Sequence, residues 1–207
     1  MPPSSAWHDA VLSGVTPEAY DPAGARALLE EAGFTAENPA TVHFWFPTGV
    51  TRPFMPDPEA LHAAVTQMLE DAGFTVVPHS EAWGDPGYLF DAEHGYYELF
   101  LLGWPGVFDD PSNWYGTHFA YRQGEPAPQF DCAVDGLSDA IDAADAAADL
   151  TARGAAWATV AGLIHSNVCF VTLVHADTAL ALSADVRGYE PSPMGTESFS
   201  GVWLAGD

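Results

Sequence analysis

The chain contains no lysine and only five arginines, against 29 aspartates and glutamates. This imbalance gives a formal net charge of −24 at pH 7. Because a strongly negative surface repels phosphates and anionic headgroups, we expect neither nucleic acid nor a membrane surface as a partner. Solubility in a salty or extracellular setting accounts for such a charge, and recruitment of a cationic partner or metal ion is the alternative.

Long apolar runs are absent as well. No stretch reaches the roughly 18 consecutive apolar residues that a membrane-spanning helix needs. The first five residues, 1–5, lack the basic and apolar regions of an export signal. Hydrophobic residues nevertheless make up 48% of the chain and aromatic residues 13%. The 207 residues are therefore expected to fold around a substantial core.

Cysteine is scarce as well, with only two residues in the chain. Cys132 and Cys169 are too few for a disulfide scaffold. They either form one bridge or remain two buried thiols that behave as small hydrophobic residues. The pattern favours the thiols and does not exclude the bridge.

Two helices are expected to begin and end on the same signals. Asp21 and Asp57 are favourable N-caps, each followed by a proline at the first helical position. Gly33 and Gly73 are typical residues just past a helix end. The positions predicted to face the core are Ala25, Leu28, Leu29 and Ala32 in the first helix, and Leu61, Ala64, Val65, Met68, Leu69 and Ala72 in the second.

Strands are predicted at 41–46, 74–77, 97–102 and 168–174, with a further extended segment at 178–183. Residues 1–20 are interpreted as an irregular lead-in, and 105–132 as a long structured loop with short helical pieces. A helix is predicted at about 133–147, with its aspartates facing water and with a buried face formed by Val134, Leu137, Ile141 and Ala144. A second helix is predicted at about 151–166, with a buried face formed by Trp157, Val160, Ala161 and Ile164. The alternation indicates an α/β fold, a mixed sheet flanked by helices.

Several short sequence motifs resemble those of one protein family, and they occur along the chain in the same order as in that family. They are Pro2-Pro3 followed by Trp7, the helix from Tyr20-Asp21-Pro22 to Ala32-Gly33, Arg52-Pro53-Phe54-Met55-Pro56-Asp57-Pro58, Gly103-Trp104 with Asp110-Pro111-Ser112-Asn113, Val134-Asp135, Gly188-Tyr189 and Val202-Trp203-Leu204. Together they are similar to the dipeptide- and oligopeptide-type (family 5) extracellular solute-binding proteins of ABC importers. Each phrase is weak alone, and the collinear set is fairly specific.

The resemblance implies a two-lobed, periplasmic-binding-protein-like architecture (type II, the cluster of peptide binders) that closes by a hinge. Members of this family are usually more than twice as long as this chain, and the resemblance covers only the later part of their length. Residues 1–183 are then the C-terminal lobe. Residues 184–207 correspond to the segment that normally packs back on the first lobe, which this chain lacks. The implied partners are that lobe, an ABC permease and a small peptide-like or carboxylate-bearing solute. The full-length relatives are extracytoplasmic, either periplasmic or lipid-anchored.

The same resemblance suggests ligand contacts. Arg52 matches the arginine that takes the ligand carboxylate in the dipeptide branch, and its planar guanidinium suits that role. A structural salt bridge is an equally open interpretation. The aspartate that takes the ligand amine is replaced by Val107, and a reshaped loop would let Asp109 substitute. Asp110 is expected to cap a helix. Trp83 and Trp104 are predicted to cover the ligand, whereas Trp114 is predicted to pack in the core.

Other chemistry has little support. The eight histidines show no metal-ligand spacing, and no nucleophile elbow or phosphate loop is present. We therefore expect no metal, no cofactor and no enzyme activity. The main hypothesis is a solute-binding lobe of an ABC importer. The alternative is an orphan lobe that acts as an interaction module without useful solute affinity.

Overall fold

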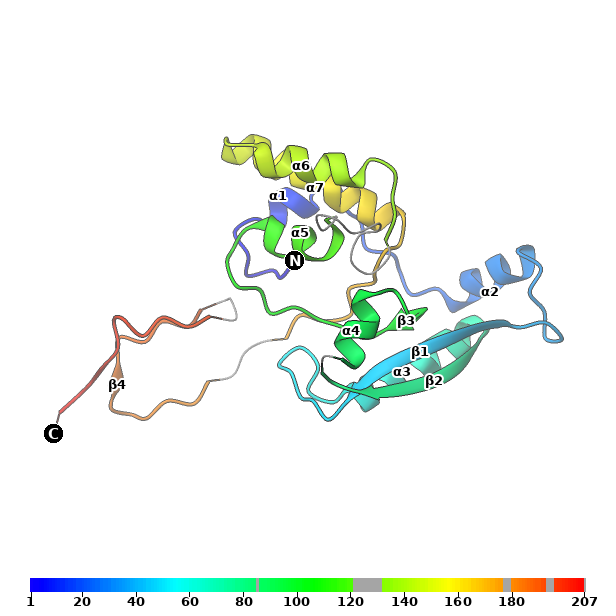
Figure 1. Ribbon diagram of the computed structural model, residues 1–207, viewed down its shortest axis with the longest axis horizontal. Helices are drawn as coiled ribbons and strands as arrows, with labels where there is room; N and C mark the ends of the chain where they lie inside the picture. Colours follow the sequence, from blue (N-terminus) through cyan, green and yellow to red (C-terminus); the bar gives the residue numbers. More distant parts are fainter. Residues whose placement is uncertain (85, 121–131, 177–179, 193–195, 207) are drawn as a thin grey trace. The chain divides into compact units, whose positions relative to one another are not determined.

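A computed structural model describes residues 1–84, 86–120, 132–176, 180–192 and 196–206. The chain divides into two compact units. The α/β unit comprises Thr16–Gly103 with Gln129–Asp131, and the helical unit comprises Met1–Val15, Trp104–Pro128 and Cys132–Asp207. Figure 1 follows the order of the elements along the chain.

The α/β unit is built on a parallel sheet. Strands β1 (Ala40–Thr48) and β2 (Phe74–Ala82) pair along their whole length, from Ala40 opposite Phe74 to Thr48 opposite Ala82. The short β3 (Leu99–Phe100) pairs with β1 on its other side, so the order is β2-β1-β3. Helix α3 (Pro58–Ala72) forms the crossover from β1 to β2 (Figure 1). The predicted α/β class, with a sheet flanked by helices, is confirmed; the three described strands of this sheet are parallel.

The predicted helix signals are confirmed. Asp21 caps α2 (Pro22–Glu31) by accepting a hydrogen bond from the Gly24 backbone N–H, and Asp57 caps α3 in the same way. Gly73 ends α3 with a φ of 104°, a left-handed conformation that suits glycine. The predicted burial of α2 is wrong, because no residue of this helix is buried and Leu28 is 67% exposed.

Successive side chains of β1 point to opposite faces of the sheet, and each face packs against its own apolar cluster. Phe44 points to the cluster with Met55 and Leu101, against which Leu61, Val65 and Leu69 of α3 pack. Trp45 packs in the cluster of Tyr88, Ala92 and Tyr97, where α4 (Tyr88–Glu93) contributes the first two. The sequence pattern missed His62, which is buried in α3 and stacks on Phe44 with 4.2 Å between ring centroids.

The helical unit holds the largest buried cluster. Its elements are α1 (His8–Leu12), the 3₁₀ turn η1 (Pro111–Asn113), α5 (Tyr115–Phe119), α6 (Leu137–Ala146) and α7 (Leu150–Ser166). The predicted buried stripe of α7 is confirmed, with Trp157 and Val160 fully enclosed. Trp114 also packs in this core, as expected. Residues 1–20 are less irregular than predicted because α1 forms there, and α6 begins four residues later than predicted, after Gly136.

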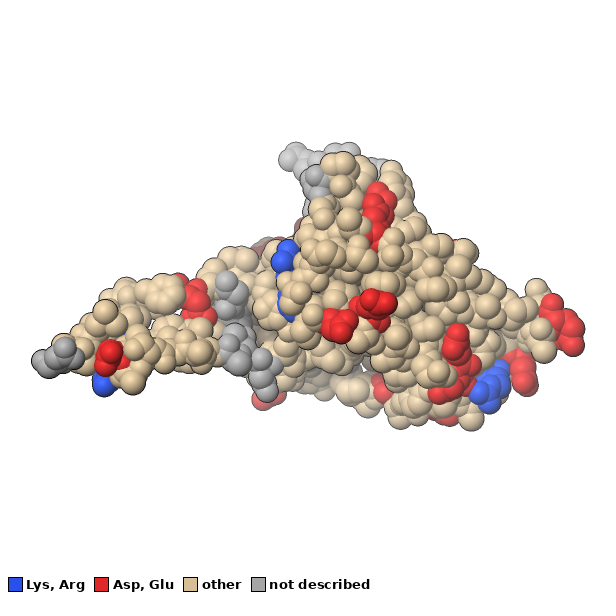
Figure 2. All heavy atoms as spheres, turned by 90° about the horizontal axis from the view of Figure 1, so that it is seen from below, with Lys and Arg blue, Asp and Glu red and all other residues tan. Residues whose placement is uncertain are grey.

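The acidic side chains of α6 stay on the surface. Asp139, Asp142 and Asp145 of α6 are exposed while Leu137, Ile141 and Ala144 are buried, as the helical pattern predicts. On the face shown in Figure 2, red acidic side chains clearly outnumber blue basic ones. None of the helices described in the structure has the length and apolar character required to cross a membrane.

The two cysteines form a disulfide that joins Cys132 to Cys169, with 5.6 Å between their Cα atoms. The preferred interpretation of two free thiols is therefore wrong. The separation falls within the range that disulfide geometry requires. The bridge anchors the start of the segment 168–174 to the helical core, because Cys132 belongs to that core and Cys169 packs against it.

The predicted strand at 168–174 does not form. Apart from Cys169, its side chains are exposed instead, among them Val168 at 70% and Val171 at 69%. Of the predicted segment 178–183, residues 178 and 179 lie outside the described part and 180–183 form no strand. In the predicted tail, β4 (Val186–Arg187) and β5 (Trp203–Leu204) pair as a short antiparallel ribbon.

Candidate functional site

Arg52 lies in a tight turn shortly after β1. Its backbone N–H donates to the Met55 carbonyl (3.2 Å), and the Met55 N–H donates back to the Arg52 carbonyl (2.9 Å). Met55 is buried at the base of the turn, and the ring of Phe54 lies against Gly103. A Cβ atom at Gly103 would stand 2.2 Å from that ring, so the Gly-Trp phrase needs glycine for this packing. The turn is therefore held by Phe54 and Met55, directly after Arg52.

Trp83 directly follows β2 and lies beside Arg52. The arginine Cζ is 4.8 Å from the centroid of the Trp83 ring, a cation–π arrangement. The backbone N–H of Trp83 donates to the Thr48 carbonyl at the end of β1 (2.9 Å). Because β1 and β2 are parallel neighbours, the residues after both strands emerge at the same sheet edge, where ligands of open α/β sheets bind. The structure thus brings together two of the predicted ligand contacts.

The Arg52 guanidinium makes few polar contacts within the described part of the chain. The guanidinium donates a long hydrogen bond to the Thr51 carbonyl (3.4 Å), and the side chain is partly exposed. Among the described residues, no carboxylate forms an ion pair with it. Of the two open interpretations of Arg52, the structural salt bridge therefore finds no support in this part of the chain. The N–H groups of the Arg52 guanidinium therefore remain available for a carboxylate.

Trp104, Val107 and Asp109 belong to the helical unit. Trp104 is 38% exposed, and its indole N–H donates to Oδ1 of Asn113 (3.2 Å). The buried Asn113 side chain donates in turn to the Phe108 carbonyl (2.8 Å). The asparagine of the Asp-Pro-Ser-Asn phrase is therefore the group that holds the loop after Trp104 in shape.

Val107 and Asp109 have different surroundings. Val107 is 48% exposed, and its carbonyl accepts a hydrogen bond from the Thr196 hydroxyl (3.2 Å). The Asp109 carboxylate accepts from the Ser5 hydroxyl (2.5 Å) and from the Ala6 N–H (2.9 Å). Both carboxylate oxygens thus bind the N-terminal segment here. The ligand roles of Val107, Asp109 and Trp104 stay predictions.

Asp110 caps η1 as the sequence predicts, with its carboxylate accepting from the Ser112 N–H (3.0 Å). It also pairs bidentately with Arg153 of α7, at 2.9 Å from Nε and 2.7 Å from Nη2. Burial alone would raise the pKa of Asp110, but the hydrogen bonds from Arg153 and Ser112 outweigh it and lower that pKa. Sequence reasoning missed Arg153; its rarity as one of five cations was the available signal.

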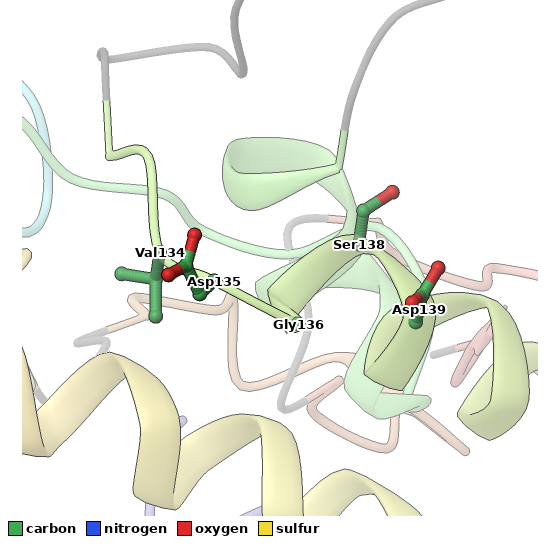
Figure 3. Close-up of a pocket in the computed structure, with 5 residues that line it drawn as sticks. All are labelled: Val134, Asp135, Gly136, Ser138 and Asp139. Carbon is green, nitrogen blue, oxygen red and sulfur yellow. The ribbon is translucent and has the colours of Figure 1, made fainter.

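A pocket lies at the N-terminus of α6 and contains none of the predicted contacts. Val134, Asp135, Gly136, Ser138 and Asp139 line it, and Figure 3 shows the side chains of Ser138 and Asp139 projecting from the first turn of the helix. It is a shallow depression with two carboxylates and no cation. Within the described ranges, no three histidine, cysteine or acidic side chains converge as a metal site.

Comparison with known proteins places these features in one family. Residues 1–125 match the model of the bacterial extracellular solute-binding proteins, family 5 middle region, which is more than half of the chain. The chain belongs to the family 5 extracellular solute-binding proteins. The matched region contains all five predicted ligand contacts.

The relatives of this family 5 chain are binding proteins by name. The dipeptide-binding protein of Escherichia coli is 26% identical over 184 residues, which cover 88% of this chain and 34% of that protein. A di/tripeptide-binding protein of Pseudomonas aeruginosa is 28% identical, with 89% and 34% covered. Heme-binding protein A of Haemophilus influenzae is 25% identical, with 90% and 33% covered. The family 5 chain thus spans about a third of the length of these relatives.

Solved structures share the fold. A dipeptide-binding protein from Pseudoalteromonas, in complex with Met-Leu, matches with a TM-score of 0.75 and 22% identity over 98% of this chain and 39% of that one. An ABC transporter-associated periplasmic binding protein from Helicobacter pylori, in complex with a peptide, matches with a TM-score of 0.73 and 22% identity over 99% and 38%. The expected periplasmic-binding-protein-like fold is confirmed.

Proposed function

We propose that this chain forms one lobe of a solute-binding protein that delivers a small peptide-like or carboxylate-bearing solute to an ABC permease. Family membership and the names of the dipeptide- and tripeptide-binding relatives support this proposal. The observation that carries it is the Arg52 guanidinium, held over Trp83 at the carboxyl edge of the sheet without a carboxylate partner among the described residues.

The chemistry of the site fits a carboxylate. A guanidinium offers two parallel N–H groups that match the two oxygens of a carboxylate. The Trp83 ring, with its centroid 4.8 Å from the guanidinium carbon, supplies apolar surface for the ligand. Since Val107 takes the place of the family's amine-binding aspartate, and Asp109 binds the N-terminal segment, we infer that a free ligand amine is not required.

Arg52→Ala tests the carboxylate role in a protein that carries this lobe together with a second one. Because a hydrogen-bonded charge contributes roughly 1.5–3 kcal/mol, we expect affinity for dipeptides to fall about 10- to 100-fold in calorimetry. Arg26→Ala is the matched control, since Arg26 donates to the Asp71 carbonyl between α2 and α3. Unchanged affinity in Arg52→Ala, with the fold intact by circular dichroism, would refute the role.

The segment 168–174 and the tail 184–207 extend the proposal. Val168, Val171 and Leu204 are all about 70% exposed, and apolar patches of this kind mark surfaces that another part of a protein covers. We propose that the tail packs on a first lobe, formed by the part of the relatives' length that this chain does not match. The disulfide suits an extracytoplasmic compartment, either the periplasm or the cell surface.

The alternative, an orphan lobe that serves as an interaction module, has the same exposed apolar segments in its favour. Half of a cleft provides half of the contacts, so this chain alone is expected to bind peptides weakly. Titration of the lone chain with dipeptide mixtures tests the orphan-lobe interpretation. Tight binding by the lone chain would eliminate the orphan-lobe interpretation.

A further inference from the structure

Two histidines meet on one face of the sheet, where His43 is exposed. His43 lies on β1 opposite Val77, and His79 lies on β2 opposite Trp45. They are therefore offset by two positions and project from the same face. His43 Nδ1 stands 2.7 Å from His79 Nε2, and the two rings stack with 4.9 Å between centroids. Parallel pairing of β1 and β2 thus produces a pair of converging imidazole nitrogens.

The surroundings of this His43–His79 pair hold it in place. His79 stacks on Trp45 at 4.3 Å, and Trp45 stacks on the buried Tyr97 at 4.4 Å. The pair therefore ends a row of packed rings, with His43 facing solvent. Glu98 Oε2 accepts a hydrogen bond from the His43 backbone N–H (2.8 Å), which fixes the strand and places a carboxylate nearby.

The geometry points to a surface site for a divalent late transition-metal ion such as Ni²⁺, Cu²⁺ or Zn²⁺, bound by His43 Nδ1 and His79 Nε2. Imidazole nitrogens are preferred ligands of these ions. With metal–nitrogen distances of about 2.0–2.1 Å, two ligands on one ion stand roughly 3 Å apart, close to the separation observed here. The inference does not depend on the proposed solute-binding function.

Binding requires a change of tautomer. In the metal-free pair, one nitrogen carries the hydrogen and the other accepts it. For both to present lone pairs to an ion, that proton must move to the other nitrogen of its own ring, so the net charge of the neutral pair is unchanged. No third metal-ligating side chain joins the pair in the described part of the chain, so water would complete the coordination. The net charge of −24 raises the local cation concentration.

Calorimetric titration of the untagged 207-residue chain with NiCl₂, in excess MgCl₂, tests the site. We expect one saturable site, and a loss of affinity of about tenfold or more in both His43→Gln and His79→Gln, because a chelate reduced to one ligand loses its effective concentration. Excess Mg²⁺ occupies carboxylates and leaves imidazole free, so it separates this site from binding to the acidic surface.

His94→Gln is the matched control. His94 is exposed in the same unit, but its Nδ1 approaches the Phe90 carbonyl rather than a second histidine. Its Ni²⁺ affinity should stay within about twofold of the original chain. The electron paramagnetic resonance spectrum with one equivalent of Cu²⁺ should show two coupled nitrogens, reduced to one or none in His43→Gln. Absence of Ni²⁺ binding, loss of binding in Mg²⁺, or equal affinity in His43→Gln would each overturn the site.

Discussion

Two apolar segments of similar composition, 97–102 and 168–174, lie in opposite environments. In the first, Leu99 and Phe100 pair with β1, and Leu101 is buried against Phe44 and Met55. In the second, Val171 and Leu173 are exposed and have no strand beside them in the described chain. A strand is stabilised by a neighbour that satisfies its backbone and covers its side chains, and propensity alone supplies neither.

One side chain does much to secure the first segment. The Tyr88 hydroxyl donates to the Leu101 carbonyl (2.7 Å) and accepts from the Leu101 N–H (3.0 Å), just past the end of β3. Burial raises the pKa of Tyr88, so the hydroxyl stays neutral and remains a donor. Segment 168–174 is anchored at its start, by the disulfide at Cys169 and by the Phe170 ring, which stacks on Phe119 with 5.5 Å between centroids, and its residues from 171 onward are exposed.

The same substitution in the two segments should give the largest contrast. Leu101 is 4% exposed, and Leu101→Ala is expected to lower the free energy of unfolding by about 2–5 kcal/mol, through lost burial and a residual cavity. Leu173 is 46% exposed, and Leu173→Ala should change it by no more than about 0.5 kcal/mol. Urea unfolding followed by circular dichroism measures both. Similar losses would show that 168–174 is buried in solution.

Reduction of the disulfide should have the next largest effect, and in the helical unit alone. The bridge closes a separation of 37 residues, which corresponds to about 2–4 kcal/mol of stabilisation. Hydrogen exchange with and without dithiothreitol should show lower protection in α6 and α7, and unchanged protection in β1. The double variant Cys132→Ser with Cys169→Ser should reproduce the reduced state. Equal loss in both units would mean that they unfold together.

The predictability of the fold follows the same distinction. Caps at Asp21 and Asp57 and the buried stripe of α7 were predictable, since local rules determine them. The exposure of Leu28 and the absence of a strand at 168–174 were not, because they depend on which surfaces are covered in space. Pairing of Cys132 with Cys169 likewise needs a distance that no sequence pattern contains.

The candidate site shows the same limit. Arg52 and Trp83 were predicted separately from family phrases, and their contact follows only once β1 and β2 are known to be parallel neighbours. The bidentate partner of Asp110 was missed because Arg153 lies 43 residues away in α7. His62 was missed because its helix face was assigned by apolar residues, whereas an aromatic imidazole between Phe44 and Phe46 packs as one of them.

Acidification should have the smallest effect on the free energy of unfolding, and it acts through the buried imidazole of His62. Burial lowers the pKa of His62, although a hydrogen bond with the Phe44 carbonyl (3.1 Å) partly opposes this. In the unfolded chain the pKa is near 6.5, so below that pH the unfolded state binds more protons than the folded state. Stability supplied by His62 is therefore complete above about pH 6.5 and declines as the pH falls through the lower folded value.

His62→Gln isolates this contribution, because glutamine keeps an N–H donor for the Phe44 carbonyl and does not titrate. Burial also lowers the pKa of His175, which lies just after segment 168–174. Acidification therefore lowers the unfolding free energy of both proteins through His175, and only the difference between their pH dependences reports on His62. Unfolding free energies between about pH 7 and pH 5 should fall more steeply for the original chain than for His62→Gln. Parallel slopes would mean that His62 is hydrated in solution, and that the packing of α3 on β1 is looser than the buried imidazole indicates.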